Sequence, residues 1–100
     1  MFYYRFEWDP AKAASNNGKH GVDFETAATV FHDLLTLTIP DAEHSSDEER
    51  WVTLGQTHNG QLLVVAHTFN ESGANAATIR IISARPATKR EQHQYEEATR

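Results

Sequence analysis

The 100-residue sequence contains no cysteine, and this absence excludes disulfide bonds, thiolate metal sites and a catalytic thiol. It also has no apolar run as long as the roughly 18 residues that a membrane-spanning helix requires. The N-terminal apolar stretch up to Trp8 is interrupted by Arg5 and Glu7. These absences favour a soluble protein of the reducing cytoplasm that has no membrane as a partner.

Several motifs that carry common chemistries are also missing. The five glycines do not have the spacing of a phosphate-binding loop, and no serine lies in a Gly-x-Ser-x-Gly context. No His-Glu-x-x-His pair is present, and the acidic stretch 41–49 lacks the Asp-x-Asp-x-Asp-Gly order of a calcium loop. We therefore expect neither a metal ion nor another cofactor.

The composition is that of one folded domain over residues 1–100. Hydrophobic residues make up 39% of the chain and aromatic residues 10%, and no internal repeat or low-complexity linker is present. The net charge of −5 opposes nucleic-acid binding, but its distribution is uneven. Five of the nine basic residues lie between Arg80 and Arg100, whereas acidic residues gather in 41–49. A basic surface is thus compatible with an acidic chain.

The first half of the sequence predicts one strand, two helices and a second strand. Residues 2–8 are rich in aromatics, and Asp9-Pro10 then caps a helix that runs to about His20 and ends at Gly21. Asp23 caps a second helix, whose apolar residues recur at helical spacing as far as Leu35. From residue 35 to residue 39 the period changes to two, which indicates a strand that ends at Pro40.

The second half predicts three strands and a last helix. Strands over 50–57 and 61–69 flank the Asn59-Gly60 turn, and a loop over 70–77 precedes a strand over 78–85. Thr88 and Glu91 form a capping box that opens a helix over 89–99, with only Tyr95 and Ala98 as apolar contacts. The expected order is β-α-α-β-β-β-β-α. This order indicates an α+β fold, in which one mainly antiparallel sheet packs against two N-terminal helices and a C-terminal helix.

Six histidines are candidates for proton transfer, because imidazole titrates near neutrality. His67 lies in an apolar strand pattern with Val65 and Phe69, which favours a hydrogen-bonded histidine in or beside the core. His20 differs because it ends a predicted helix, where the helix dipole favours the protonated ring. That position suits an acid or a phosphate-binding group.

Arg80 and Arg85 on one predicted strand, with Glu49 and Arg50 at the start of another, suggest a phosphate site. Metal-free RNA cleavage needs a base for the ribose 2′-hydroxyl, an acid for the departing oxygen, and cations for the charge on the phosphate. Glu49 is the candidate base, His20 the acid, and the arginines the stabilising groups. Surface salt bridges between the arginines and Glu49 or its neighbours are the alternative. Positions 80 and 85 also differ by an odd number, so an unbent strand points them to opposite faces.

The sequence resembles BrnT family toxins over nearly its whole length. The string Arg80-Ile81-Ile82-Ser83-Ala84-Arg85 is the most specific match. The other matching residues, in chain order, are Phe6-Glu7-Trp8-Asp9-Pro10, Lys12, Asn16, Lys19-His20-Gly21, Phe24-Glu25, Ala27-Ala28, Glu49-Arg50, Gly55, Leu63-Val64-Val65, Ala87-Thr88, Glu91 and Tyr95-Glu96.

This resemblance implies a RelE-like fold and a metal-independent endoribonuclease toxin that arrests translation. It implies a BrnA-like antitoxin partner that neutralises the toxin in a hetero-oligomer, with operator DNA bound only through the antitoxin. The residues carried over to the site are His20, Glu49, Arg50, Arg80 and Arg85. Lys19 and Lys89 are carried over as RNA-binding residues.

Two other functions remain open at this point. The first is a catalytically weak or inactive homologue that acts as a protein-binding module in an autoregulatory repressor complex. The net acidity favours it, as does Asn70 in a region where BrnT relatives often have a basic residue. The second is a metal-dependent hydrolase, which the motif content disfavours.

Overall fold

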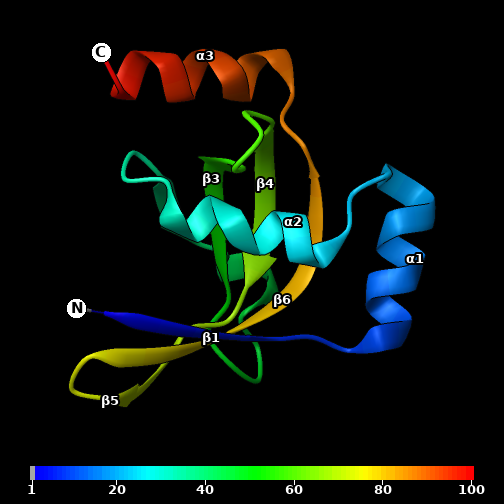
Figure 1. The fold of residues 1–100 in the computed structure, drawn as a ribbon, viewed down its shortest axis with the longest axis vertical. Coiled ribbons are helices and arrows are strands. Elements are labelled where there is room, and N and C mark those ends of the chain that lie inside the picture. The colour runs from blue at the N-terminus through cyan, green and yellow to red at the C-terminus, as the bar shows by residue number, and fades with distance from the viewer. Residues whose placement is uncertain (1) are drawn as a thin grey trace.

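The computed structural model describes residues 2–100, and it has an α+β fold (Figure 1). Six strands form a mixed sheet, and three α-helices lie around it. The elements are β1 (Tyr3–Glu7), α1 (Pro10–His20), α2 (Phe24–Ala28), β2 (Leu37–Pro40), β3 (Trp51–Gln56), β4 (Leu62–His67), β5 (Asn70–Gly73), β6 (Ala76–Pro86) and α3 (Lys89–Ala98).

Helix starts and ends follow the predicted capping residues. The Asp9 carboxylate accepts a hydrogen bond from the Ala11 amide, and Gly21 ends α1 in the left-handed conformation with φ 67°. The Asp23 carboxylate caps α2 through the Thr26 amide. The capping box of Thr88 is also present at the start of α3. These local predictions are confirmed because the interactions that cap a helix lie within a few residues of each other.

Two predictions about the helices and strands were wrong. The second helix does not reach Leu35, because α2 ends at Ala28 and a 3-10 turn continues to His32. The segment expected as a loop over 70–77 instead contains β5, which forms a hairpin with the start of β6. All four residues of β5 are exposed, and the segment has none of the alternation of apolar and polar residues from which a strand is predicted. The observed order therefore has one strand more than predicted.

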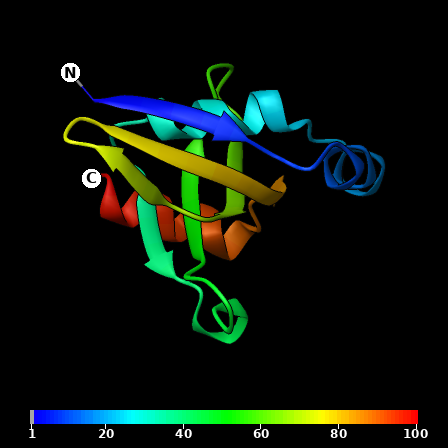
Figure 2. The ribbon, with the colours of Figure 1, turned by 90° about the horizontal axis from the view of Figure 1, so that it is seen from below.

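The sheet has the strand order β1-β6-β4-β3-β2, and β5 also pairs with β6. β1 runs parallel to β6, and the other pairings are antiparallel. Figure 2 shows α2 on one side of the sheet and α3 on the other, whereas α1 stands beside β6. The long strand β6 therefore contacts β1, β4, β5 and α1, and it is the element on which the layout depends.

The two faces of the sheet are covered unequally. The face under α2 carries the main core, which includes Phe24, Leu63, Val65 and Ile79. The face under α3 has a much smaller cluster, in which Tyr95 packs against Leu54 and Val64. The Tyr95 hydroxyl also donates to Asp33 Oδ2 at 2.6 Å. Tyr95 is thus a contact of α3 as predicted, but Ala98 is exposed, so the expected second contact is absent.

His67 is a buried residue of the main core side, as its strand pattern predicts. It is 2% exposed, and the edge of Phe31 meets its ring at a centroid distance of 4.8 Å. Its Nδ1 lies 3.1 Å from the Thr68 carbonyl oxygen, so Nδ1 carries the proton and donates there. Its Nε2 then accepts from the Thr53 hydroxyl at 2.7 Å. Burial lowers the pKa of His67, which favours this neutral state.

A β-bulge changes the alternation of β6. His67 pairs with Ile81, but the preceding residue Ala66 pairs with Ser83, so Ile82 is an extra residue on β6. Before the bulge the buried positions of β6 include Ile79 and Ile81, whereas after it Ala84 is buried. Odd-numbered residues of β6 therefore face the main core before the bulge, and even-numbered residues face it after the bulge.

Asn16 on α1 occupies the open edge of β6 after the bulge. β1 pairs with β6 only as far as Arg80, so Ala84 has no strand neighbour on that side. The Ala84 amide donates to Asn16 Oδ1 at 3.0 Å, and Asn16 Nδ2 donates to the Ala84 carbonyl at 2.8 Å. Nδ2 also donates to the Val22 carbonyl at 3.1 Å. The Asn16 amide thus pairs with Ala84 as a neighbouring strand does, and it joins α1 to the sheet.

We predict that Asn16→Ala lowers the free energy of unfolding by about 3 kcal/mol, because it leaves the buried amide and carbonyl of Ala84 without partners. Asn16→Asp retains the acceptor but loses the two donors, so it should also destabilise the protein. Urea unfolding followed by circular dichroism measures both changes. Asn17→Ala, at an exposed position of the same helix, is the control. Equal losses from Asn16→Ala and Asn17→Ala would contradict the role of Asn16.

Candidate functional site

The bulge brings the side chains of Arg80 and Arg85 to the same face of the sheet. Without it their odd separation would place them on opposite faces, as the sequence indicates. Ile81 and Ala84 face the main core. Because Ile82 is the extra residue, the side chains of both arginines point to the other face of the sheet, which lies under α3. Each arginine side chain is about two-fifths exposed, at 39% for Arg80 and 41% for Arg85. Their guanidinium groups therefore remain within reach of a ligand in solution.

Arg50 lies on the same face and near the same end of the sheet as Arg80. Alternation along β3 places it with Val52 and Leu54, and its carbonyl accepts from the Asp41 amide at 2.8 Å. Trp51 pairs with His67 on β4 and His67 pairs with Ile81 on β6, so Arg50 and Arg80 are the residues that come just before Trp51 and Ile81. Arg50 Nε is buried without a hydrogen-bond partner among residues 2–100. Arg50, Arg80 and Arg85 together are called the arginine face below.

Both strand arginines form ion pairs with carboxylates. Arg80 Nη2 donates to Glu48 in the acidic loop, which is one of the neighbours of Glu49 that the sequence offers as a partner. Glu49 instead lines a pocket of about 280 Å³ with Arg50, Ser45 and other residues of the same loop. The structure therefore confirms that Arg80 contacts this acidic stretch, and it identifies the neighbouring carboxylate as the partner.

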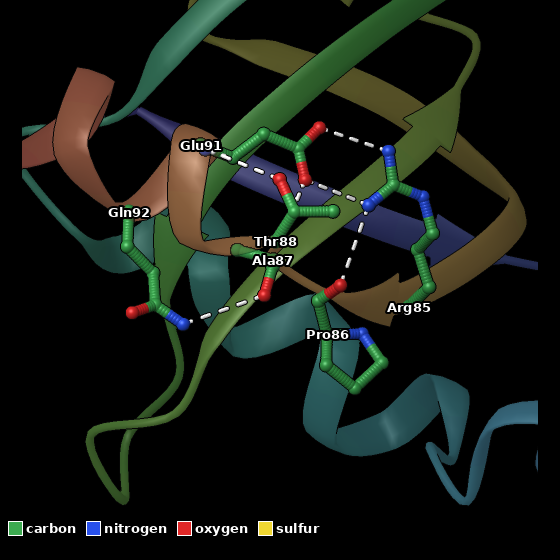
Figure 3. Close-up of polar contacts among 6 residues, drawn as sticks. All are labelled: Arg85, Pro86, Ala87, Thr88, Glu91 and Gln92. Atoms are coloured by element: carbon green, nitrogen blue, oxygen red, sulfur yellow. Dashed lines mark hydrogen bonds and ion pairs between the residues drawn. The ribbon is translucent and has the colours of Figure 1, made fainter.

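Arg85 pairs with Glu91 through two parallel hydrogen bonds (Figure 3). Nη1 lies 2.8 Å from Oε1 and Nη2 lies 2.9 Å from Oε2, and Nη1 also donates to the Pro86 carbonyl at 3.3 Å. The Arg85 guanidinium lowers the pKa of Glu91 to about 2, and Glu91 raises the pKa of Arg85. Glu91 Oε1 also accepts from the Thr88 amide at 2.8 Å. One carboxylate thus joins the start of α3 to β6.

Lys19 and His20 lie apart from the arginine face, in a pocket of about 200 Å³ between α1 and β6. It is called the α1 groove below, and its lining residues are Lys12, Ser15, Asn16, Lys19, His20, Ile82 and Ser83. Lys12 and Ser15 belong to the same helix face as Lys19 and His20, because all four positions follow helical spacing. That spacing is the sequence signal for Lys12 and Ser15, which the prediction did not include among the site residues.

Lys89 is exposed in the first turn of α3, and no contact joins it to the other candidates within the described residues. No group of three or more His, Asp, Glu or Cys side chains among residues 2–100 is placed to hold a metal ion. None of the helices in the same part of the chain is long and apolar enough to cross a membrane.

Comparisons with known proteins identify a protein family and a similar solved structure. A family described as "Ribonuclease toxin, BrnT, of type II toxin-antitoxin system" matches residues 8–91. The crystal structure of the Brucella abortus ribonuclease toxin BrnT is similar with a TM-score of 0.58 and 24% sequence identity. The match covers 89% of this chain and 100% of the Brucella chain, and it shows a shared fold. No curated protein matches the sequence significantly.

We predict that Glu91→Gln lowers the free energy of unfolding by about 1 kcal/mol at pH 7, because it removes the charge that Arg85 binds. The folded-state pKa of Glu91 lies below its ordinary value of 4.5, so this stabilisation is present above pH 4.5 and is lost as the pH falls towards 2. Urea unfolding of both proteins at pH 7, 4.5 and 3 measures the difference.

The control for this prediction is Glu96→Gln, which removes the same charge from an exposed position of α3. It should change stability much less, and without the same pH dependence. A difference between wild type and Glu91→Gln that stays constant from pH 7 to pH 3 would refute the contribution of the ion pair.

Proposed function

The chain belongs to the BrnT family of ribonuclease toxins of type II toxin-antitoxin systems, and from this we propose a metal-independent endoribonuclease with a RelE-like fold. Its action on RNA in the cytoplasm arrests translation. The arginine face is the surface that binds the scissile phosphate. The observation that carries this proposal is the bulge at Ile82, because it turns Arg80 and Arg85 to the face of the sheet on which Arg50 also lies.

Three guanidinium groups suit the chemistry of metal-free RNA cleavage. The ribose 2′-oxygen attacks the adjacent phosphorus and gives its proton to a base, and the 5′-oxygen leaves with a proton from an acid. The products are a 2′,3′-cyclic phosphate and a 5′-hydroxyl. Negative charge grows on the phosphate oxygens during the attack, and arginines bind such oxygens in a bidentate manner. Glu49 as the base and His20 as the acid stay predictions from the sequence.

The ion pairs of the free protein must open for this reaction. Glu48 occupies Arg80 and Glu91 occupies Arg85, so an RNA phosphate competes with each carboxylate. Both pairs are partly exposed, and ion pairs of this kind contribute about 1 kcal/mol or less. A dianionic transition state bound to several cations can therefore displace them.

We assign the antitoxin partner to a BrnA-like protein that neutralises the toxin and supplies the contact with operator DNA. The support on this chain is the thin cover of the face under α3. A pocket of about 280 Å³ opens there between α3 and the sheet, lined by Leu37, Ile39, Val52, Leu54, Val64, Glu91 and Gln94. Ile39, which belongs to this lining, is 62% exposed. Apolar surface of this kind is typical of a protein-binding site.

A second candidate function is a catalytically inactive homologue that serves only as a binding module of the repressor complex. The specific observation in its favour is that Arg80 and Arg85 are both neutralised by carboxylates of this chain. A folded protein that binds the antitoxin but leaves RNA intact would select this function.

We predict that the purified protein cuts single-stranded RNA in the presence of EDTA, and that Arg80→Ala lowers kcat by about 10²- to 10³-fold, as does the loss of other groups that stabilise an oxyanion. A substrate with 2′-deoxyribose at the scissile position should stay intact. Gel analysis of a 5′-labelled RNA measures both effects.

Glu48→Gln is the matched variant, because it removes the carboxylate partner of Arg80 and retains the arginine. It should keep or increase kcat. Equal loss of cleavage in Glu48→Gln and Arg80→Ala would mean that the ion pair itself is required. Full activity of folded Arg80→Ala would end the assignment of Arg80 to the reaction.

A further inference from the structure

We propose that the α1 groove binds a phosphate of the RNA backbone next to the scissile one, with Lys12, Lys19, His20 and the hydroxyls of Ser15 and Ser83 as donors. This inference rests on the proposed function, because it assumes that the bound polyanion is RNA. It gives Lys12 and the two serines a role, and it gives His20 a binding role in place of the acid role predicted from the sequence.

The first support is the pattern of α1. Positions 12, 15, 16, 19 and 20 share one helix face, and in a packed helix this stripe is usually apolar. Here it reads Lys, Ser, Asn, Lys and His. The helix packs on the main core through the partly buried Ala13 instead. The face that α1 turns towards the groove is therefore polar and basic, and it is not a hydrophobic packing surface.

The second support is the rigid floor of the groove. Asn16 is 7% exposed, and both hydrogens of its amide nitrogen are used by the carbonyls of Val22 and Ala84. Its oxygen accepts from the Ala84 amide. Asn16 is thus fully occupied and holds α1 at a defined position against β6. The donors that remain for a ligand are those of the lysines, the histidine and the serines around it.

The third support is the charge of the groove. None of its lining residues is acidic. Lys12, Lys19 and His20 form no ion pair with any residue in 2–100, whereas Arg80 and Arg85 are both paired. Three basic side chains thus line one pocket of a chain whose net charge is −5. Such a site favours an anionic ligand, and hydroxyl donors beside ammonium groups suit phosphate oxygens.

The fourth support is the position of the groove relative to the arginine face. Ile82 and Ser83 line the groove, and they lie between Arg80 and Arg85 on β6. The part of β6 that contains the bulge therefore also borders α1. A single strand that crosses this edge contacts the arginines with one phosphate and the α1 groove with a neighbouring phosphate.

Binding of a 2′-deoxy oligonucleotide tests the inference separately from cleavage, because this ligand lacks the attacking hydroxyl. Fluorescence anisotropy measures its Kd for wild type and for Lys12→Gln/Lys19→Gln between 50 and 200 mM salt. We expect about tenfold weaker binding and a salt slope that is smaller by about 1.4, from two lost contacts at about 0.7 each for single strands. Arg5→Gln/Arg90→Gln removes the same charge from exposed positions outside the groove, and should change Kd less than twofold.

The same titration with and without a 5′-phosphate distinguishes an internal phosphate from a terminal one. Equal effects of the lysine variant on both ligands support an internal phosphate, and an effect only on the phosphorylated ligand overturns it. Equal losses in the two double variants, or no loss in the lysine variant, also overturn the proposal. If the lysine variant binds the oligonucleotide normally but loses its antitoxin, the groove is a protein-binding site.

His20→Gln separates binding from proton transfer. We expect it to weaken binding of the 2′-deoxy oligonucleotide severalfold, which the loss of a group that acts only as the acid would not do. Unchanged oligonucleotide binding together with a loss of kcat would return His20 to the role of the acid. A protein that cuts no RNA but shows the expected loss of binding in the lysine variant would reject the proposed function and keep the groove.

Discussion

The hydrogen bonds between the Asn16 side chain and the backbone of Ala84 hold α1 against the second half of β6, where the groove and the bulge lie. β1 leaves the second half of β6 without a strand neighbour, and a buried amide or carbonyl without a partner costs about 1–3 kcal/mol. Asn16 satisfies both groups of Ala84, and its contact with the Val22 carbonyl also holds the turn after α1. The side chain thereby replaces a missing strand, and it sets the distance between α1 and the bulge.

The bulge at Ile82 then determines which side chains can act together. It places Arg80 and Arg85 on one face, and it brings Ser83 to the edge where α1 lies. The two surfaces differ in how their charge is balanced. Glu48 and Glu91 neutralise the strand arginines, whereas no carboxylate of the described residues pairs with Lys12, Lys19 or His20. A polyanion bound at the proposed groove therefore displaces no carboxylate of the described residues, whereas at the strand arginines it must displace Glu48 and Glu91.

Glu91 connects this surface to the weakly held α3. It caps the helix through Thr88 and binds Arg85, and Tyr95 is the one buried side chain of that helix. The α3 helix is thus fixed at its start by charge and in its middle by a single ring. Because its cover of the sheet is thin, the apolar residues beneath it remain accessible to a protein partner.

Features that depend on near neighbours in the chain follow from the amino-acid sequence: the caps of all three helices, the turn at Asn59-Gly60, the strand periods and the residue types of the site. Its family resemblance, carried by Arg80 to Arg85 and other strings, is confirmed by the match over 8–91. Three other features become visible only in the folded chain: β5 is a strand, Glu48 and Glu91 are the arginine partners, and Arg80 and Arg85 share a face. A bulge, an ion pair across 32 positions and the hydrogen bonds between Asn16 and Ala84 depend on strand register, and local pattern does not specify register.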